Sequence, residues 1–377
     1  MTANMTAEAQ HNLRIPVTLV TGFLGSGKTT FINKALRAPE LSKTVVVVNE
    51  FGEVGLDHSL FASSNDSVIV LENGCLCCTV RSDLVSTLNN LYYDRQAGRI
   101  PDFDNVVIET SGLAEPAPVL QAFLSEPTLD GLFRVASVIT LVDAVNWQKT
   151  TEQHDEALRQ VALADQILMT KLDLVDGDKA AAQNVLVDEL TRLNPAANIS
   201  AIDWDTAIIA KFLKSEGFDP ANPNANPLPW LNLIAHQQQD PSTGDPRFHL
   251  YAKGVESFIL LRDNPLTRDE LQFLLDGIAQ NLGPSLLRVK GLVNIVEEPG
   301  KPAVIQGAQH LLHTMTWLDA WPDSDQRTRV VFITQGIVRD KLKEIVELLD
   351  RMSERTFKAR ERGRLAREAA TKGAQVA

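Results

Sequence analysis

A glycine-rich segment near the amino terminus restricts the fold of this 377-residue chain more than any other feature. Residues 21–30 read TGFLGSGKTT and match the pattern G-x-x-x-x-G-K-[ST], which joins a buried β-strand to the start of a helix. The preceding run IPVTLV is apolar and β-branched, as such a strand requires, and a helical pattern follows. The segment therefore predicts a P-loop NTPase domain of the α/β class, built on a mostly parallel sheet.

The residue types of this segment suit a phosphate group. Glycines let backbone N–H groups wrap an anion at the positive end of a helix, and a lysine adds charge at the β/γ oxygens. A threonine hydroxyl directly after the lysine is a ligand for Mg²⁺. The alternative is a glycine-rich turn with a chance lysine, which would need neither the strand nor the helix. The candidate nucleotide-binding residues are Gly22, Gly25, Ser26, Gly27, Lys28, Thr29 and Thr30.

Short apolar runs alternate with helical patterns from residue 15 to about 200, which is typical of a parallel sheet covered on both faces. Ligands of such sheets bind at the carboxyl ends of the strands. The expected strands end at Val20, Val48, Leu71, Ile108, Val142 and Met169.

Two of these strand ends carry residues suited to a nucleotide. Glu109 follows NVVI and is a candidate for holding Mg²⁺ or polarising the attacking water, although a helix N-cap at Thr110 or Ser111 is the alternative. Lys171 and Asp173 follow QILM. The lysine stem could stack on a purine, and the carboxylate could accept hydrogen bonds from guanine N1 and N2, which favours GTP; an exposed ion pair is the other interpretation.

All three cysteines fall within four positions, at Cys75, Cys77 and Cys78, so they cannot staple distant loops together. Thiolates prefer Zn²⁺, Cu⁺ or similar ions, and three of them leave a position for a further ligand, which suits a transferable metal. Buried apolar cysteines and a vicinal redox pair are the alternatives. Glu50 and Glu53 follow the second strand and could reach either Mg²⁺ or the thiolate metal, unless they are ordinary exposed carboxylates.

Six of the chain's 18 prolines lie between residues 217 and 246, which predicts a domain boundary there. Beyond it we expect a smaller α+β domain, with strands in residues 248–261, 285–296 and 329–337 around a helix at Thr267–Ala279. The expected organisation is a flexible terminus at 1–13, the P-loop domain at 14–216, a linker at 217–246, the α+β domain at 247–338, and a helix with a basic tail at 339–377.

The chain has 36 basic and 48 acidic residues, a formal net charge of −12, which disfavours nucleic acid as a partner. The first fourteen residues lack the apolar stretch of a secretory signal, and no run of 18 apolar residues occurs. We therefore expect a cytoplasmic protein that does not enter a membrane. Histidines 58, 154, 249, 310 and 313 are scattered and are interpreted as structural.

The motifs TGFLGSGKTT, NEFGEVGLD, ENGCLCC, VVIETSGLAEP and TKLD, in this order, closely resemble the CobW-type family of metal-trafficking GTPases. The resemblance extends through FHLYAKGVESF, LLRVKGLV and VVFITQGI, and so covers most of residues 14–340. It implies a GTPase with Mg²⁺ as cofactor, whose Cys-x-Cys-Cys site binds Zn²⁺, with Co²⁺ or Fe²⁺ as alternatives. Nucleotide state would be coupled to metal transfer into a client protein.

The same resemblance assigns roles to particular residues and shows two departures. It implies phosphate binding by the loop at 22–30, the acidic role in hydrolysis for Glu109, and guanine recognition by Lys171 and Asp173. Thr170 stands where many GTPases have Asn, and the linker HQQQDPSTGDPRFH lacks the histidine-rich tract of several relatives. Rival interpretations are a cobalt-handling protein of cobalamin biosynthesis, a metal- or redox-sensing module without transfer, and an ATP-dependent kinase with a structural metal.

Overall fold

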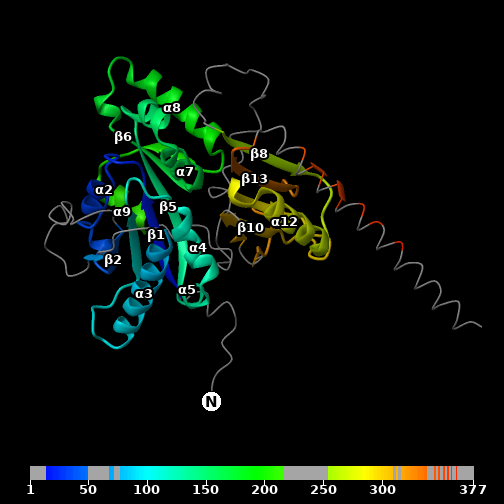
Figure 1. The fold of residues 1–377 in the computed structure, drawn as a ribbon, viewed down its shortest axis with the longest axis horizontal. Coiled ribbons are helices and arrows are strands. Elements are labelled where there is room, and N and C mark those ends of the chain that lie inside the picture. The colour runs from blue at the N-terminus through cyan, green and yellow to red at the C-terminus, as the bar shows by residue number, and fades with distance from the viewer. Residues whose placement is uncertain are drawn as a thin grey trace, which may run out of the picture. The chain divides into compact units, whose positions relative to one another are not determined.

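The structure, a computed structural model, forms two compact units, Met1–Ser257 and Phe258–Ala377 (Figure 1). It describes residues 14–49, 68–71, 77–214, 254–308, 311–312 and 316–337, together with single helical positions between 344 and 362. The expected terminus at 1–13 and linker at 217–246 lie outside the described residues, so the predicted domain boundaries stay predictions. No helix of the described part is both long and apolar enough to cross a membrane.

The first unit is built on a seven-stranded sheet in the order β3-β2-β4-β1-β5-β6-β7, with every pair parallel. Its strands are β1 (Ile15–Thr21), β2 (Thr44–Asn49), β3 (Val68–Leu71), β4 (Asn105–Thr110), β5 (Phe133–Asp143), β6 (Gln166–Thr170) and β7 (Asn198–Ala201). The predicted α/β class with a parallel sheet is therefore confirmed. β5 begins earlier than the apolar run ASVITLV indicated.

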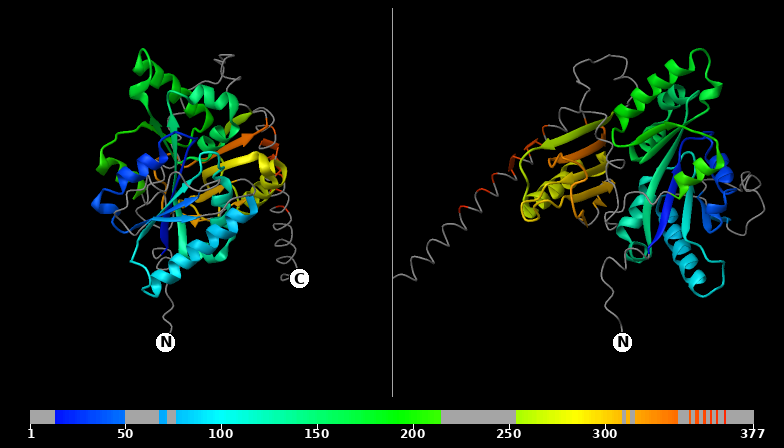
Figure 2. Two further views of the ribbon diagram at one scale, coloured as in Figure 1. Left: turned by 60° about the vertical axis from the view of Figure 1, so that its left-hand side comes forward. Right: turned by 180° about the vertical axis from the view of Figure 1, so that it is seen from behind.

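Helices cover both faces of this sheet, with α2 and α9 on one side and α4 and α7 on the other (Figures 1 and 2). The face beneath α2 and α9 is closely packed, since Val20, Phe31, Ile139 and Leu141 are at most 1% exposed. The helices are α2 (Lys28–Ala35), α3 (Cys77–Gln96), α4 (Ala117–Ser125), α5 (Pro127–Leu132), α6 (Trp147–Gln153), α7 (Asp155–Leu163), α8 (Lys179–Leu193) and α9 (Thr206–Leu213), with 3-10 turns η1 (Pro39–Leu41) and η3 (Leu172–Leu174).

One strand of the first unit, β7, was not expected from the sequence. It contains only the four residues NISA at the edge of the sheet, and none of them is buried. Short edge strands bury little apolar surface, so they lack the continuous apolar run that marks the inner strands.

The second unit contains a sheet with the strand order β11-β10-β9-β13-β8, and the short strand β12 also pairs with β10. Its elements are β8 (Val255–Arg262), α12 (Arg268–Leu282), η5 (Gly283–Ser285), β9 (Leu286–Val293), β10 (Ala303–Ala308), β11 (Leu311–Leu312), β12 (Thr316–Trp317) and β13 (Thr328–Gln335). The pairings of β9 with β10 and β13 are antiparallel, so this is the smaller α+β domain that the sequence predicted. The expected final helix from about residue 339 is described only at isolated positions, which are helical.

The core of the second unit lies between α12 and one face of this sheet. Leu271 and Ile278 of α12 are fully buried in one cluster with Val293 of β9 and Phe332 of β13. The rings of Phe258 and Phe332 stack with their centroids 6.4 Å apart. β10 was missed because its sequence, AVIQGA, follows a proline and contains a glycine, both unfavourable signals for a strand.

The start of α12 is stabilised by reciprocal hydrogen bonds between Thr267 and Glu270. Glu270 N–H donates to Thr267 Oγ1 at 3.2 Å, and Thr267 N–H donates to Glu270 Oε2 at 2.7 Å. Both residues are 5% exposed. This capping box satisfies two N–H groups that the helix itself leaves without partners.

We expect Thr267→Ala to destabilise the second unit by about 1 kcal/mol, because it removes the acceptor for the Glu270 amide. The denaturation midpoint should fall, and the Glu270 amide should exchange its hydrogen faster. Thr267→Ser keeps the hydroxyl and serves as the matched control. Equal losses in the two variants would show that the methyl group, not the cap, is responsible.

Candidate nucleotide-binding site

The register of the parallel strands brings the predicted site residues to one edge of the first sheet. Val20 pairs with Glu109, and Asn49 pairs with both Thr110 and Leu71. The carboxyl ends of β1, β4, β2 and β3 are therefore level. The hydroxyls of Thr21 and Thr110, both buried, join β1 to β4 at this edge by a 2.9 Å hydrogen bond.

The predicted phosphate loop leaves β1 and enters α2 as the motif requires. Gly22 has φ 140°, and a Cβ built there would lie 2.4 Å from the carbonyl oxygen of Leu141, so only glycine lets the loop pass β5 this closely. Gly25 and Gly27 also have positive φ, and Gly27 begins the helix without a side-chain cap. The first turn of α2 thus presents backbone N–H groups toward the loop.

Lys28 is drawn inward by the loop that precedes it. Its side chain is buried, with the residue 8% exposed, and its Nζ donates to the carbonyl oxygens of Gly22 at 2.8 Å and Phe23 at 3.2 Å. The positive charge is therefore held at the mouth of the loop. Ser26 Oγ is buried nearby and has no hydrogen-bond partner among the described residues.

Thr29 and Glu109 meet across the sheet edge, 80 residues apart in sequence. The Thr29 hydroxyl donates to Glu109 Oε1 at 2.7 Å, and Glu109 is 5% exposed. The sequence placed Glu109 after its strand, whereas β4 extends through Thr110, so the carboxylate projects from the strand itself. A hydroxyl and a carboxylate are oxygen ligands of the kind Mg²⁺ prefers.

Thr170, at the end of β6, ties the candidate base site to the phosphate loop. Its Oγ1 donates to the carbonyl oxygens of Ser26 at 3.0 Å and Val142 at 3.2 Å. The hydroxyl therefore bridges the loop and β5 at the position where many GTPases carry Asn. Any movement of the loop at Ser26 must strain this bond or break it.

Lys171 adopts the left-handed conformation, with φ 60°, the only such non-glycine residue among those described. Its Nζ donates to Asp143 Oδ2 at 2.7 Å. Asp143 also accepts from the amides of Val145 and Asn146 and from the Asn146 side chain. Burial tends to raise the pKa of Asp143, but the bonds from Lys171 and Asn146 outweigh it and hold that pKa below its ordinary value.

Asp173 lies exposed in η3, two residues beyond Lys171, and its carbonyl oxygen accepts from Lys179 Nζ at 2.5 Å. Thr30 is likewise exposed, on the first turn of α2. Asp143 was not predicted from the sequence. The available signal was an acidic residue directly after the apolar run ASVITLV, the same signal that identified Glu109.

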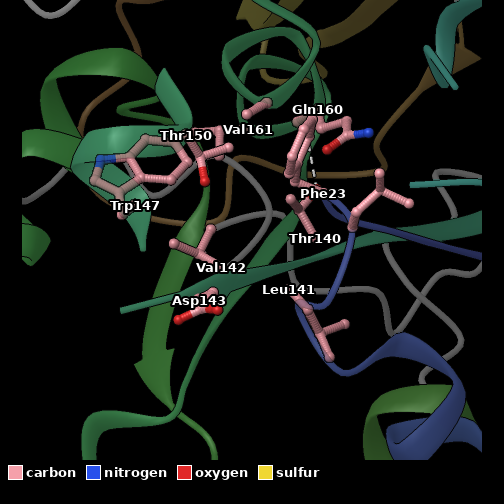
Figure 3. Close-up of a pocket in the computed structure, with 11 residues that line it drawn as sticks. Phe23, Thr140, Leu141, Val142, Asp143, Trp147, Thr150, Gln160 and Val161 are labelled. Atoms are coloured by element: carbon pink, nitrogen blue, oxygen red, sulfur yellow. Dashed lines mark hydrogen bonds between the residues drawn. The ribbon is translucent and has the colours of Figure 1, made fainter. Parts of the chain in front are cut away.

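A pocket lies beside the phosphate loop, and residues from four segments line it (Figure 3). Its walls include Phe23 from the loop, Asp143 from β5, Trp147 from α6 and Gln160 from α7. The Phe23 ring also lies 4.6 Å from that of His154, measured between centroids.

The predicted metal site is only partly described. α3 begins at Cys77 and includes Cys78, whose side chains lie outside the described part, as do Cys75, Glu50 and Glu53 altogether. Among the described residues no group of three or more His, Cys, Asp or Glu side chains is arranged to hold a metal ion. The cysteine site and the two switch carboxylates therefore stay predictions.

The described residues do fit a nucleotide with Mg²⁺. A buried lysine faces the loop, a buried serine hydroxyl in the loop has no partner within the described part of the chain, and the first turn of the helix has no side-chain cap there. Thr29 and Glu109 supply adjacent oxygen ligands. This donor set, on a parallel sheet with its loop between β1 and α2, defines a P-loop nucleotide-binding protein.

Comparison with known proteins agrees with this class. Residues 16–201 match the family described as CobW/HypB/UreG, nucleotide-binding domain, and residues 255–349 match the cobalamin synthesis protein cobW C-terminal domain. The chain is 32% identical over 319 residues to the zinc chaperone YjiA of Escherichia coli, covering 85% of this chain and 93% of that one. It is 29% identical to the zinc chaperone CobW of a Sinorhizobium species, with 79% and 86% covered.

A solved structure is similar as well. The crystal structure of Zn(II)-bound YjiA GTPase from E. coli superposes with a TM-score of 0.62 at 27% identity, covering 89% of this chain and 99% of that one. The chain therefore belongs to the CobW family and is a P-loop GTPase of that family. The predicted family and fold class are confirmed.

We expect Asp143→Asn to weaken the binding of GTP and GDP alike, by roughly fivefold to tenfold, because it removes the charge-assisted bond that holds Lys171 in a costly conformation. Titration calorimetry would measure both affinities. Since the pKa of Asp143 is lowered, the ion pair forms fully above the ordinary aspartate pKa and is lost only as pH falls through the depressed value.

Asp178→Asn is the matched control, because Asp178 only caps α8 and asparagine caps equally well. The control should bind both nucleotides as the wild type does. Unchanged affinities in Asp143→Asn would show that the position of Lys171 does not matter for nucleotide binding.

Proposed function

We propose that this protein is a GTP-hydrolysing metallochaperone, which binds Zn²⁺ or another divalent metal at Cys75, Cys77 and Cys78. GTP binding and hydrolysis would be coupled to metal transfer into a client protein, in the cytoplasm. The zinc chaperones among its relatives favour Zn²⁺ over Co²⁺ or Fe²⁺.

The observation that supports this proposal is the common sheet edge at which β1, which the phosphate loop follows, and β3, which the cysteines follow in sequence, both end. β3 ends at Leu71, level with the end of β4, and α3 begins at Cys77. Three strand spacings separate β3 from β1, about 14 Å. The chain that leads to Cys75 therefore leaves the sheet at the same edge as the phosphate loop.

Hydrolysis would be electrostatic, with the chain supplying position and charge. Lys28, already held inward by the carbonyl oxygens of the loop, would offset the negative charge that develops on the transferring phosphoryl group. Backbone N–H groups of the loop and of the first turn of α2 would do the same. Thr29 and Glu109 would hold Mg²⁺, which when bound neutralises charge on the β and γ phosphate oxygens.

Guanine would be recognised where β6 ends. The aliphatic stem of Lys171, fixed by its bond to Asp143, offers a flat apolar surface for the base. The exposed carboxylate of Asp173 would accept hydrogen bonds from N1 and N2, a donor pair that adenine lacks. Preferential binding of ATP would contradict this part of the proposal.

We expect Lys28→Ala to reduce GTP hydrolysis by at least about 100-fold, because the variant lacks the charge nearest the reacting phosphate. Zinc binding by the cysteines should stay within about twofold, measured by competition with a chromophoric chelator, since the thiols follow a different strand. Loss of both properties together would contradict two separable sites.

Coupling between the sites is tested by changing Cys75, Cys77 and Cys78 to Ser and titrating the metal-free protein with Zn²⁺, Co²⁺ or Fe²⁺. We expect the GTP hydrolysis rate of the wild type to change when metal is added. The rate of the cysteine variant should stay the same with and without metal. A rate that ignores both metal and cysteines would mean that the thiols are structural or redox groups. A response confined to Co²⁺ would favour the cobalt-handling alternative.

A further inference from the structure

The segment after Glu109 lies directly against the phosphate loop. A Cβ built on Gly112 would lie 2.6 Å from the backbone nitrogen of Leu24 and 2.8 Å from its Cα. Real Cβ atoms do not approach backbone this closely, so only glycine allows the contact. The two loops therefore cannot move independently at this point.

A fully buried glutamine of α7 holds the same segment from the other side. Gln160 is 0% exposed, and its Nε2 donates to the carbonyl oxygens of Gly112 and Ala114, both at 3.0 Å. The opposite amide orientation would place an oxygen against two carbonyl oxygens, so the chemistry fixes which atom faces the segment. Its neighbour Arg159 bonds to the carboxylate of Glu115.

The helix that carries these side chains is itself anchored to the sheet. The hydroxyl of Thr140, on β5, donates to the Gln160 carbonyl oxygen at 2.8 Å, and Figure 3 shows this residue beside Gln160. At the end of α7, Asn194 Nδ2 donates to the carbonyl oxygens of Val161, Ala162 and Ala164 at 2.8–3.2 Å. Gln160 thus connects the segment after Glu109 to a helix that is itself held on the sheet.

We propose that Gln160, assisted by Arg159, is a positioning residue for GTP hydrolysis. The two side chains, here called the α7 clamp, hold residues 112–115 against the phosphate loop, directly after the strand β4 that carries Glu109. When a γ-phosphate binds near Lys28, residues 112–115 would already hold the position that hydrolysis requires. The inference rests on the proposed function and adds a residue that would act through the backbone of residues 112–115.

The clamp should therefore affect the binding and hydrolysis of GTP but not the binding of GDP, because only GTP carries the γ-phosphate. Gln160→Met keeps the length and apolar volume but removes both donors. We expect kcat for GTP hydrolysis and the affinity for β,γ-imido-GTP each to fall about tenfold to thirtyfold, as two lost hydrogen bonds imply. GDP affinity should stay within about twofold.

Asn194→Leu is the matched control. It also removes a buried amide that donates to carbonyl oxygens at the end of α7 and just beyond it, but none of these bonds goes to the segment at 112–115. Its Tm should fall at least as far as that of Gln160→Met, while the ratio of β,γ-imido-GTP to GDP affinity stays that of the wild type. Equal changes of this ratio in both variants, or none in Gln160→Met, would overturn the proposal.

Should Gln160→Met fail to fold, Glu115→Gln tests the other half of the clamp. Glu115 and Arg159 have side chains about one-third exposed, so the variant should fold, and the affinity ratio should fall severalfold. An unchanged ratio in Glu115→Gln would then overturn the clamp. A wild type that hydrolyses no GTP would instead overturn the proposed function, and the two failures are therefore distinguishable.

Discussion

The parallel pairing of β1 with β4 is the constraint on which the candidate site depends. The pairing of Val20 with Glu109 brings the carboxylate within 2.7 Å of the Thr29 hydroxyl. A shift by one residue would turn Glu109 to the opposite face of the sheet, and a shift by two would move it by about 6.7 Å. The buried hydroxyl bond between Thr21 and Thr110 holds this register at the sheet edge, where backbone pairing ends.

Much of this arrangement could be predicted from the sequence because its signals are local. The run before Gly22 and the motif ending in Thr29 announce a strand, a loop and a helix within sixteen residues. Apolar β-branched runs marked six of the seven strands of the first sheet, and the acidic residue that follows one of these runs is Glu109. Such signals depend on neighbours in the chain, so they survive without knowledge of the fold.

The contacts that organise the site could not be predicted, since they join residues far apart in the chain. Gln160 reads as one polar position on an amphipathic helix, and only the fold places its amide on the carbonyl oxygens of residues 112 and 114. Thr170 reads as a substitution for Asn, and the structure shows the hydroxyl bridging two segments. β7 and β10 were missed for different reasons. β7 lacks a continuous apolar run, and β10 follows a proline and contains a glycine.

The left-handed backbone of Lys171 sets protein stability against the base recognition that we propose for its side chain. A residue with a Cβ in this conformation costs about 1 kcal/mol, whereas glycine adopts it freely. Selection for thermostability alone would consequently favour glycine at this position and so remove the side chain that we propose stacks on the base. Any effort to increase the thermostability of this protein by directed evolution must therefore screen for nucleotide binding as well as for heat resistance.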